Sequence, residues 1–157
     1  PTTTTTVPAG PECLGFPATI VGTSGDDRIR GTNGRDVIVG LAGDDRILGL
    51  HGDDVICAGD GDDLVVGGQG DDTLVGGSGD DHLIGGPGDD ELDGGPGDDK
   101  CHGGPGNNTI RNCEHARNAA NTGTSAEARG PTTTSPQARA MTILSWLGDA
   151  LRRLRLL

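Results

Sequence analysis

Residues 22–111 repeat with a period of nine residues, without an insertion or a deletion. One copy spans residues 76–84 and reads Gly-Gly-Ser-Gly-Asp-Asp-His-Leu-Ile, and the next spans residues 85–93 and reads Gly-Gly-Pro-Gly-Asp-Asp-Glu-Leu-Asp. A short, unbroken period means that one small unit is stacked on itself. The chain is therefore predicted to fold as a solenoid rather than around a single globular core.

Two positions of the nine-residue unit carry its chemistry. Position six is occupied by Asp27, Asp36, Asp45, Asp54, Asp63, Asp72, Asp81, Asp90, Asp99 and finally Asn108. Position eight is occupied by Ile29, Ile38, Ile47, Ile56, Val65, Leu74, Leu83, Leu92, Cys101 and Ile110. Each unit thus contributes one side chain that can bind a cation and one apolar side chain that can be buried.

The composition excludes an ordinary hydrophobic core. The 157 residues include 30 Gly but no Tyr, one Phe and one Trp, and large apolar side chains supply most of the area that a core buries. Such a composition alone is typical of disorder, yet a disordered chain has no reason to keep aliphatics in phase with aspartates. We therefore expect a fold that depends on a bound cation and is largely unfolded without it.

The charge of the repeat favours cations as partners. The net charge of the chain is −12, and residues 22–111 contain 19 Asp and one Glu against five Arg and one Lys. Such a surface repels phosphate backbones, so we expect no binding of nucleic acid. No stretch reaches the roughly 18–20 apolar residues of a membrane span.

The pattern Gly-Gly-x-Gly-x-Asp predicts calcium as the cation. Glycine permits positive φ angles, so the loop can curl until several carbonyl oxygens face one point, to which the position-six carboxylate adds a charged oxygen. Oxygen ligands without histidine or thiolate suit calcium better than zinc or copper, and magnesium demands stricter geometry. The three residues after each aspartate are predicted to form a short strand with the middle side chain inward. Plain Asp-Gly turns without metal are the alternative.

The same residues resemble the RTX, or haemolysin-type, calcium-binding repeat, whose pattern is Gly-Gly-x-Gly-x-Asp-x-aliphatic-x. The resemblance covers 90 of the 157 residues. It implies an all-β fold, a right-handed parallel β-roll: a two-layer solenoid with two copies per coil. The composition and residue spacing outside the repeat add disordered flanks and a short C-terminal helix. The resemblance also implies several calcium ions between the coils, held by position-six carboxylates and carbonyls of the glycine-rich turns.

Carried onto this chain, the resemblance places the position-six side chains in two columns. One column would contain Asp27, Asp45, Asp63, Asp81 and Asp99, and the other Asp36, Asp54, Asp72, Asp90 and Asn108. Neighbours within a column give up to eight calcium positions, of which the Asp90/Asn108 pair is the weakest because an amide carries no charge. The second aspartates, at position five, would act only as nearby negative charge.

Departures from the pattern concentrate in the first five copies, so the sites from Asp63 to Asp99 rank above those nearer the N-terminus. The departing residues are Thr23, Thr32, Arg35, Leu41, Leu50 and Ala58.

Composition divides the chain into six segments. The expected organisation is a Thr/Pro-rich tether (1–12), an N-terminal cap (13–21), the roll of ten repeats (22–111), a C-terminal cap (112–121), a linker (122–140) and an amphipathic helix (141–157). The helix has a basic end, so it could contact an anionic membrane surface or the solenoid, serve as a secretion signal, or have no dedicated role. Because the chain starts at Pro1, we expect a processed or trimmed N-terminus.

The four cysteines lie outside the repeated ligand positions. In an extracellular setting they are expected to pair, and of the three connectivities Cys101–Cys113 is favoured because both residues lie at the C-terminal end of the stack. This leaves Cys13–Cys57, and both bonds would then clamp the ends of the solenoid. A zinc site built from Cys101, His102, Cys113 and His115 is the alternative, although the spacing matches no standard finger.

No catalytic motif is present: there is no His-Glu-x-x-His, Gly-x-Ser-x-Gly or Gly-x-x-x-x-Gly-Lys sequence. The leading hypothesis is a secreted, extracellular, monomeric, non-catalytic calcium-binding β-roll that folds when it meets calcium. The alternatives are the repeat region of a larger secreted enzyme or toxin, and a cell-surface adhesion or envelope-associated module. The latter would use an outward apolar strip formed by Val37, Val39, Leu48, Val55, Val66, Val75 and Ile84.

Overall fold

The computed structural model describes residues 10–118, which form strands and turns without any helix. The strands are β1 (Glu12–Cys13), β2 (Phe16–Pro17), β3 (Ile20–Val21), β4 (Arg28–Arg30), β5 (Val37–Ala42), β6 (Arg46–His51), β7 (Val55–Asp60), β8 (Leu64–Gln69), β9 (Thr73–Ser78), β10 (His82–Ile84), β11 (Glu91–Asp93), β12 (Lys100–His102), β13 (Thr109–Arg111) and β14 (His115–Arg117). The expected helix over 141–157, the linker over 122–140 and most of the tether lie outside the described residues.

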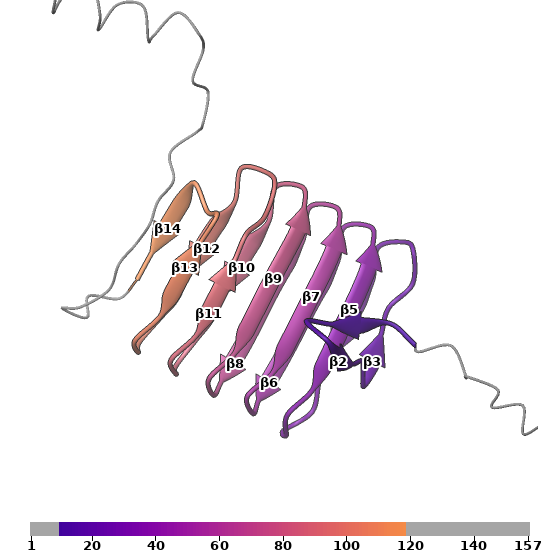
Figure 1. The fold of residues 1–157 in the computed structure, drawn as a ribbon, viewed down its shortest axis with the longest axis horizontal. Coiled ribbons are helices and arrows are strands. Elements are labelled where there is room, and N and C mark those ends of the chain that lie inside the picture. Colours follow the sequence, from indigo (N-terminus) through magenta and orange to yellow (C-terminus); the bar gives the residue numbers. More distant parts are fainter. Residues whose placement is uncertain (1–9, 119–157) are drawn as a thin grey trace, which may run out of the picture.

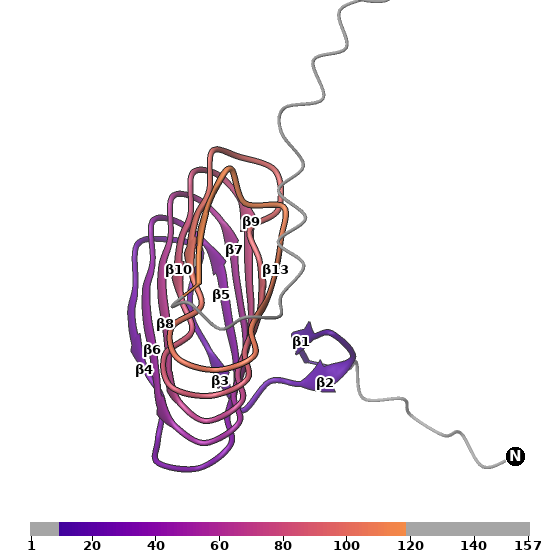
Figure 2. The ribbon, with the colours of Figure 1, turned by 90° about the vertical axis from the view of Figure 1, so that its left-hand side faces the viewer.

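Successive repeats alternate between two parallel six-stranded sheets. One sheet has the order β14-β12-β10-β8-β6-β4, and the other has the order β13-β11-β9-β7-β5-β3. Leu83 pairs with Val65 on one side and with Cys101 on the other, so residues that are two repeats apart lie side by side. Figure 1 shows the strands stacked along the long axis, and Figure 2 shows the coils as flattened loops seen end on. The predicted two-layer parallel β-roll is therefore confirmed.

The core between the sheets consists of the position-eight side chains. From Ile38 to Ile110 every one of them is at most 3% exposed, and Ile20, Ile29 and Ala116 extend the same row with partly buried side chains. Since strand side chains alternate between faces, each three-residue strand buries only its middle residue. The core is consequently one side chain wide, as the sequence predicts.

The glycines let the turns stack at backbone contact distance. Gly79, at position four, has a φ of +129°, and a Cβ added to it would lie 2.2 Å from the carbonyl oxygen of Gly61 one coil earlier. At position two, Leu41 and Leu50 adopt φ values of 91° and 92° where later copies have glycine. These two leucines therefore occupy a backbone conformation that side chains other than glycine rarely adopt.

An antiparallel hairpin, β1–β2, lies against the outer face of one sheet. It packs on β5 and β7, and the disulfide Cys13–Cys57 joins it to β7. Arg35 places its guanidinium 4.8 Å from the centre of the Phe16 ring, which adds a cation–π contact. Figure 2 shows this hairpin beside the roll rather than over its open end. The predicted pairing is correct, but the idea that this bond clamps an end is wrong.

The hairpin also corrects the prediction of one exposed apolar strip. Val37, Val39 and Val55 are 6–7% exposed because they form a second small core with Cys13, packed against Ala18 and Cys57. Leu48, Val66 and Ile84 lie on the opposite sheet. The outward aliphatic residues are thus divided between two faces, and three of them are covered.

The second disulfide joins Cys101 to Cys113 at the C-terminal end of the described roll, as predicted. Both thiol sulfurs are used in this bond, which removes the alternative of a zinc site at these residues. Within residues 10–118, no helix is long and apolar enough to span a membrane.

Candidate metal sites

The position-six side chains lie where each glycine-rich turn enters the following strand, and nearly all of them are buried. Asp45, Asp54, Asp72 and Asp81 are each 1% exposed and Asp99 is 0% exposed, while Asp63, Asp90 and Asn108 reach at most 3%. Buried carboxylates are costly unless hydrogen bonds or a cation compensate the lost hydration. Whether these columns bind a cation therefore depends on how many of the carboxylate oxygens already have hydrogen-bond donors.

One carboxylate oxygen of each buried aspartate links neighbouring coils. The backbone N–H of Asp63 donates to Asp81 Oδ1 at 2.9 Å, and the N–H of Asp81 donates to Asp99 Oδ1 at 2.9 Å. In the other column the N–H groups of Asp54 and Asp72 donate to Asp72 Oδ1 and Asp90 Oδ1 at 2.9 and 3.0 Å. These bonds tie each carboxylate to the coil before it and fix its orientation.

The second oxygen of the same carboxylates has no hydrogen-bond donor. The unpaired atoms are the Oδ2 atoms of Asp45, Asp54, Asp63, Asp72, Asp81, Asp90 and Asp99. Seven buried, negatively charged oxygens without a partner are not expected in a folded protein unless a cation takes the place of the donors.

Backbone carbonyls converge on these unpaired oxygens. A Cβ added to Gly76 would lie 2.2 Å from Asp81 Oδ2 and 2.7 Å from the carbonyl oxygen of Gly94 in the next coil. A carboxylate oxygen and a carbonyl oxygen from adjacent coils thus lie close to Gly76, where any side chain would collide with them. This donor set is the one that calcium prefers.

Asn108 occupies position six in the last repeat and shows how a neutral side chain is hydrogen-bonded there. Its Oδ1 accepts the N–H of Asp90 at 2.8 Å, as an aspartate would, and its Nδ2 donates to the carbonyl oxygen of Gly104 at 2.8 Å. An electropositive NH₂ group therefore occupies the position that corresponds to the unpaired Oδ2. A cation next to the aspartates would satisfy the same carbonyls.

Burial raises the pKa of these carboxyl groups. The pKa rises to about 7 for Asp72 and Asp81 and to about 6 for Asp63 and Asp90, because desolvation outweighs the hydrogen bond from the neighbouring N–H and nearby aspartates add repulsion. For Asp99 desolvation also raises the pKa, and the charge of Glu114 is the next largest contribution that raises it. Keeping these carboxylates charged therefore costs free energy, and a bound cation would offset that cost.

The first member of each column is satisfied without a cation. Asp27 Oδ2 accepts the backbone N–H of Thr23 at 2.6 Å and the Thr23 hydroxyl at 2.9 Å. Thr32 makes the same pair of bonds to Asp36 Oδ2, at 2.7 and 3.0 Å. In the repeat pattern these threonines are only departures from glycine. Their spacing of four residues from an aspartate is the signal that could have identified them as caps.

The position-five residues form a second ladder, which the sequence analysis did not predict. The N–H of Asp62 donates to Asp44 Oδ1 and the N–H of Asp80 donates to Asp62 Oδ1, at 3.0 and 2.9 Å. In this exposed ladder each carboxylate bonds to the coil after it, opposite to the direction of the buried ladder. These aspartates therefore hold the turns together in addition to supplying charge.

Glu114 is a further residue that sequence reasoning missed. It lies before β14, and its Oε2 accepts the N–H of Asp99 at 2.8 Å, the bond that a position-six Asp Oδ1 makes elsewhere. The only sequence signal for this role is that an acidic residue directly precedes a short strand, as a position-six aspartate does.

No three His, Cys, Asp or Glu side chains converge anywhere in residues 10–118. The oxygens that the structure brings together at each place are those of a position-six carboxylate and of a backbone carbonyl in the next coil. This arrangement defines a parallel β-solenoid with oxygen-lined edges suited to hard cations.

The chain belongs to the family of RTX calcium-binding nonapeptide repeats, whose model matches overlapping segments from residue 21 to residue 110. RTX repeats bind calcium and are generally structural modules, and they are typical of secreted proteins. No curated protein and no solved structure matches the chain.

Proposed function

We propose that this protein is a secreted, non-catalytic β-roll that binds several calcium ions and whose folding is coupled to calcium binding. The observation that carries the proposal is the set of seven buried Oδ2 atoms without a hydrogen-bond donor, arranged in two columns. The proposed ligands are the position-six side chains from Asp45 to Asp99, together with carbonyls of the turns. Asp27, Asp36 and Asn108, whose side chains are hydrogen-bonded already, close the columns.

Coupling between folding and calcium follows from the narrow core. One aliphatic side chain per nine residues buries little apolar area, whereas every ordered residue loses conformational entropy. Calcium would neutralise neighbouring carboxylates and supply the missing contacts to their Oδ2 atoms. Because the unfolded chain has no preformed site, the free energy of binding becomes free energy of folding.

Secretion is supported by the chemistry of the cysteines. Both disulfides, Cys13–Cys57 and Cys101–Cys113, persist only where thiols are not kept reduced. Calcium is also far more concentrated outside cells than in the cytosol, so the chain would stay unfolded until export.

Far-ultraviolet circular dichroism of the full chain tests the proposal. We expect little strand signal in EGTA and a cooperative gain of strand signal as calcium rises to millimolar concentration. Asp81→Asn should lower the number of calcium ions bound in calorimetry, because it removes one buried charge. Asp60→Asn removes an equal charge from an exposed side chain and should leave the number unchanged. Equal strand content with and without EGTA would contradict the proposal.

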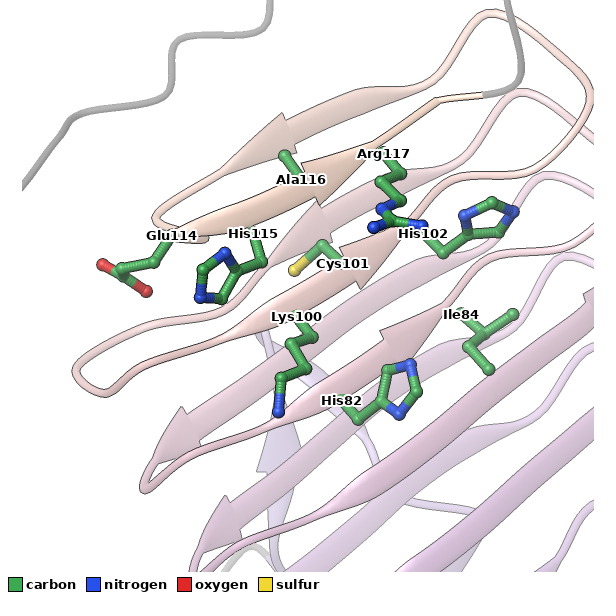
Figure 3. A pocket seen from close by; sticks show the side chains of 9 residues that line it. All are labelled: His82, Ile84, Lys100, Cys101, His102, Glu114, His115, Ala116 and Arg117. Carbon is green, nitrogen blue, oxygen red and sulfur yellow. The ribbon is translucent and has the colours of Figure 1, made fainter.

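A second candidate function, attachment to an anionic membrane surface, is favoured by the outer face of the sheet that contains β4 and β14. Its outward side chains include no acidic residue in a chain of net charge −12. They are Arg28, Arg30, Arg46, Leu48, Leu64, Val66, His82, Ile84, Lys100, His102, His115 and Arg117. Figure 3 shows the C-terminal part of this face, where a hollow is lined by basic side chains, among them Lys100 and Arg117, and at one end by Glu114, which directly precedes β14.

Co-sedimentation with vesicles tests this second candidate. Calcium-loaded full chain should bind vesicles that contain phosphatidylserine and ignore vesicles of phosphatidylcholine alone. Replacing Arg28, Arg30 and Arg46 by Gln should weaken binding several-fold, and high salt should do the same. If only truncation before Met141 abolishes binding, the attachment belongs to the C-terminal segment and this face has no such role.

A further inference from the structure

We propose that Glu114, Asp99 and the carbonyl of Asn112 form an additional calcium position beyond the last nine-residue repeat. The proposal rests on the function proposed above, because it assigns one more site of the same kind. It is not contained in the repeat pattern, in which the partner of Asp99 would lie 18 residues later.

Three residues separate β13 from β14, whereas six separate β12 from β13, and this shorter connection brings Glu114 into register. Strand β14 pairs with β12 through His115 opposite Lys100, so the residue before His115 lies opposite Asp99. Glu114 Oε2 accordingly accepts the N–H of Asp99 at 2.8 Å across a separation of 15 residues. Within the repeats, the equivalent bond from Asp81 to Asp99 Oδ1 is 2.9 Å and spans 18 residues.

An unpaired buried oxygen points to a missing cation at this place. Asp99 is 0% exposed, and its Oδ2 has no hydrogen-bond donor. Asp99 Oδ1 is already used by the N–H of Asp81. The free oxygen therefore needs a positive partner that the repeat itself does not supply.

The carbonyl that completes each site is also reproduced. A Cβ added to Gly94 would lie 2.5 Å from Asp99 Oδ2 and 2.3 Å from the carbonyl oxygen of Asn112. The corresponding distances from Gly76 are 2.2 Å to Asp81 Oδ2 and 2.7 Å to the carbonyl oxygen of Gly94. Asn112 reaches this place with a φ of +48°, a left-handed conformation that asparagine tolerates.

The two columns therefore end differently at the C-terminal end. The column of Asp90 ends at Asn108, whose amide satisfies the neighbouring carbonyl. The column of Asp99 ends at a second carboxylate, that of Glu114, which is exposed and directly precedes β14; Figure 3 labels it beside His115. Two carboxylates and a carbonyl form an oxygen donor set that selects a hard divalent cation such as calcium, and solvent access allows the ion to enter from bulk water.

Isothermal titration calorimetry of the full chain with calcium tests this assignment. Glu114→Gln should bind one ion fewer than the wild type, since the amide keeps the shape and loses the charge. Glu12→Gln, a change of the same kind at an exposed residue of β1, should bind the wild-type number. An unchanged number of ions in Glu114→Gln would overturn the assignment. Absence of calcium binding in the wild type would instead refute the function proposed for the whole chain.

A measurement on the wild-type chain keeps the inference testable if Glu114→Gln does not fold. The amide nitrogen of Cys113 is bonded to the carbonyl carbon of Asn112. Binding of a cation at that carbonyl should therefore shift the amide resonance of Cys113 in an NMR spectrum. In the calcium-loaded protein, exchange of calcium for lanthanum should move the amide resonances of Cys113 and Glu114 along with that of Asp99. A shift at Asp99 alone would place the ion only between the coils of Asp81 and Asp99 and would overturn the proposal.

Discussion

Each position-six aspartate divides its two oxygens between two tasks. In Asp81 one oxygen accepts the N–H of Asp63, and the other is buried without a donor. The first oxygen fixes the side chain, while the second leaves a buried charge that a bound cation or a proton must neutralise. The glycines make this possible, because they bring carbonyls of adjacent coils within reach of the carboxylate.

Glycine at position four is predicted to be essential only where the turns stack. Gly79→Ala should destabilise the calcium-loaded protein by roughly 1–3 kcal/mol, because Gly79 has a φ of +129° and a Cβ would meet the carbonyl oxygen of Gly61 at 2.2 Å. Urea unfolding in saturating calcium measures this loss.

Gly34→Ala is the matched control, because Gly34 also occupies position four but a Cβ there meets nothing within 4 Å. It should change the free energy of unfolding by less than about 0.5 kcal/mol. Equal losses in the two variants would show that stacking does not decide which glycines matter.

The strands are short, and stability along the roll depends on what covers them. The position-eight side chain of each repeat points inward, and among residues 10–118 only β5 and β7 also have a cover on their outer face, the β1–β2 hairpin. That hairpin consists of two strands of two residues each, too few to be stable alone. Its position therefore depends on the Cys13–Cys57 bond and on the valines beneath it.

Replacing Cys13 and Cys57 by Ala is predicted to release the hairpin without unfolding the roll. The free energy of unfolding should fall by about 2–4 kcal/mol, and the outer faces of Val37, Val39 and Val55 should become exposed. Chemical denaturation and binding of a hydrophobic dye measure the two effects in saturating calcium. Strand content by circular dichroism is the control and should be retained. Loss of the strand signal would mean that the hairpin is required for the roll to form.

For the molecule as a whole, two columns of buried negative charge oppose folding in the absence of metal. Asp63, Asp72, Asp81 and Asp90 have pKa values of about 6 to 7 in the folded chain, against an ordinary value of 3.8. Protons and calcium are therefore competing ways to neutralise the same oxygens, and the balance between them depends on pH.

Acidification is predicted to stabilise the roll in buffer stripped of calcium. Between about pH 4 and pH 7 the folded chain binds more protons than the unfolded chain, so the free energy of unfolding falls as pH rises. This stabilisation is complete below the unfolded pKa of 3.8 and is lost as pH rises through the folded values of about 6 and 7. Circular dichroism should therefore show more strand at about pH 4 than at pH 7.5.

With calcium present the dependence reverses. Protons then compete with the metal for Asp72 and Asp81, so the calcium concentration at half-maximal strand signal should rise as pH falls from about 7 to 5. A calcium midpoint that does not change over this range would show that these carboxylates are not the ligands.

The repeat made most of the architecture predictable. An aliphatic residue such as Leu83 and an aspartate such as Asp81, each repeated every nine residues, were sufficient to predict the stacked coils and the core, and the resemblance to RTX repeats added the two columns of position-six side chains. The pairing of the four cysteines also followed from where they lie relative to the stack. The coils and the core depend on local geometry that is the same in every copy, so the sequence alone determines them.

The exceptions to the period required the three-dimensional structure. Glu114 is brought opposite Asp99 by a turn that is three residues shorter than the one between β12 and β13, Thr23 replaces a cation by hydrogen bonds to Asp27, and the hairpin covers Val37 on the outer face. The first and the third depend on contacts between coils or on the outer face of a sheet, with partners 15 residues apart in the first, whereas the second is a bond within one turn between residues four apart. The sequence repeat shows only the contacts that recur in every copy. The contacts at the ends of the roll and under the β1–β2 hairpin depend on which polar and apolar groups still lack a partner once the coils are stacked.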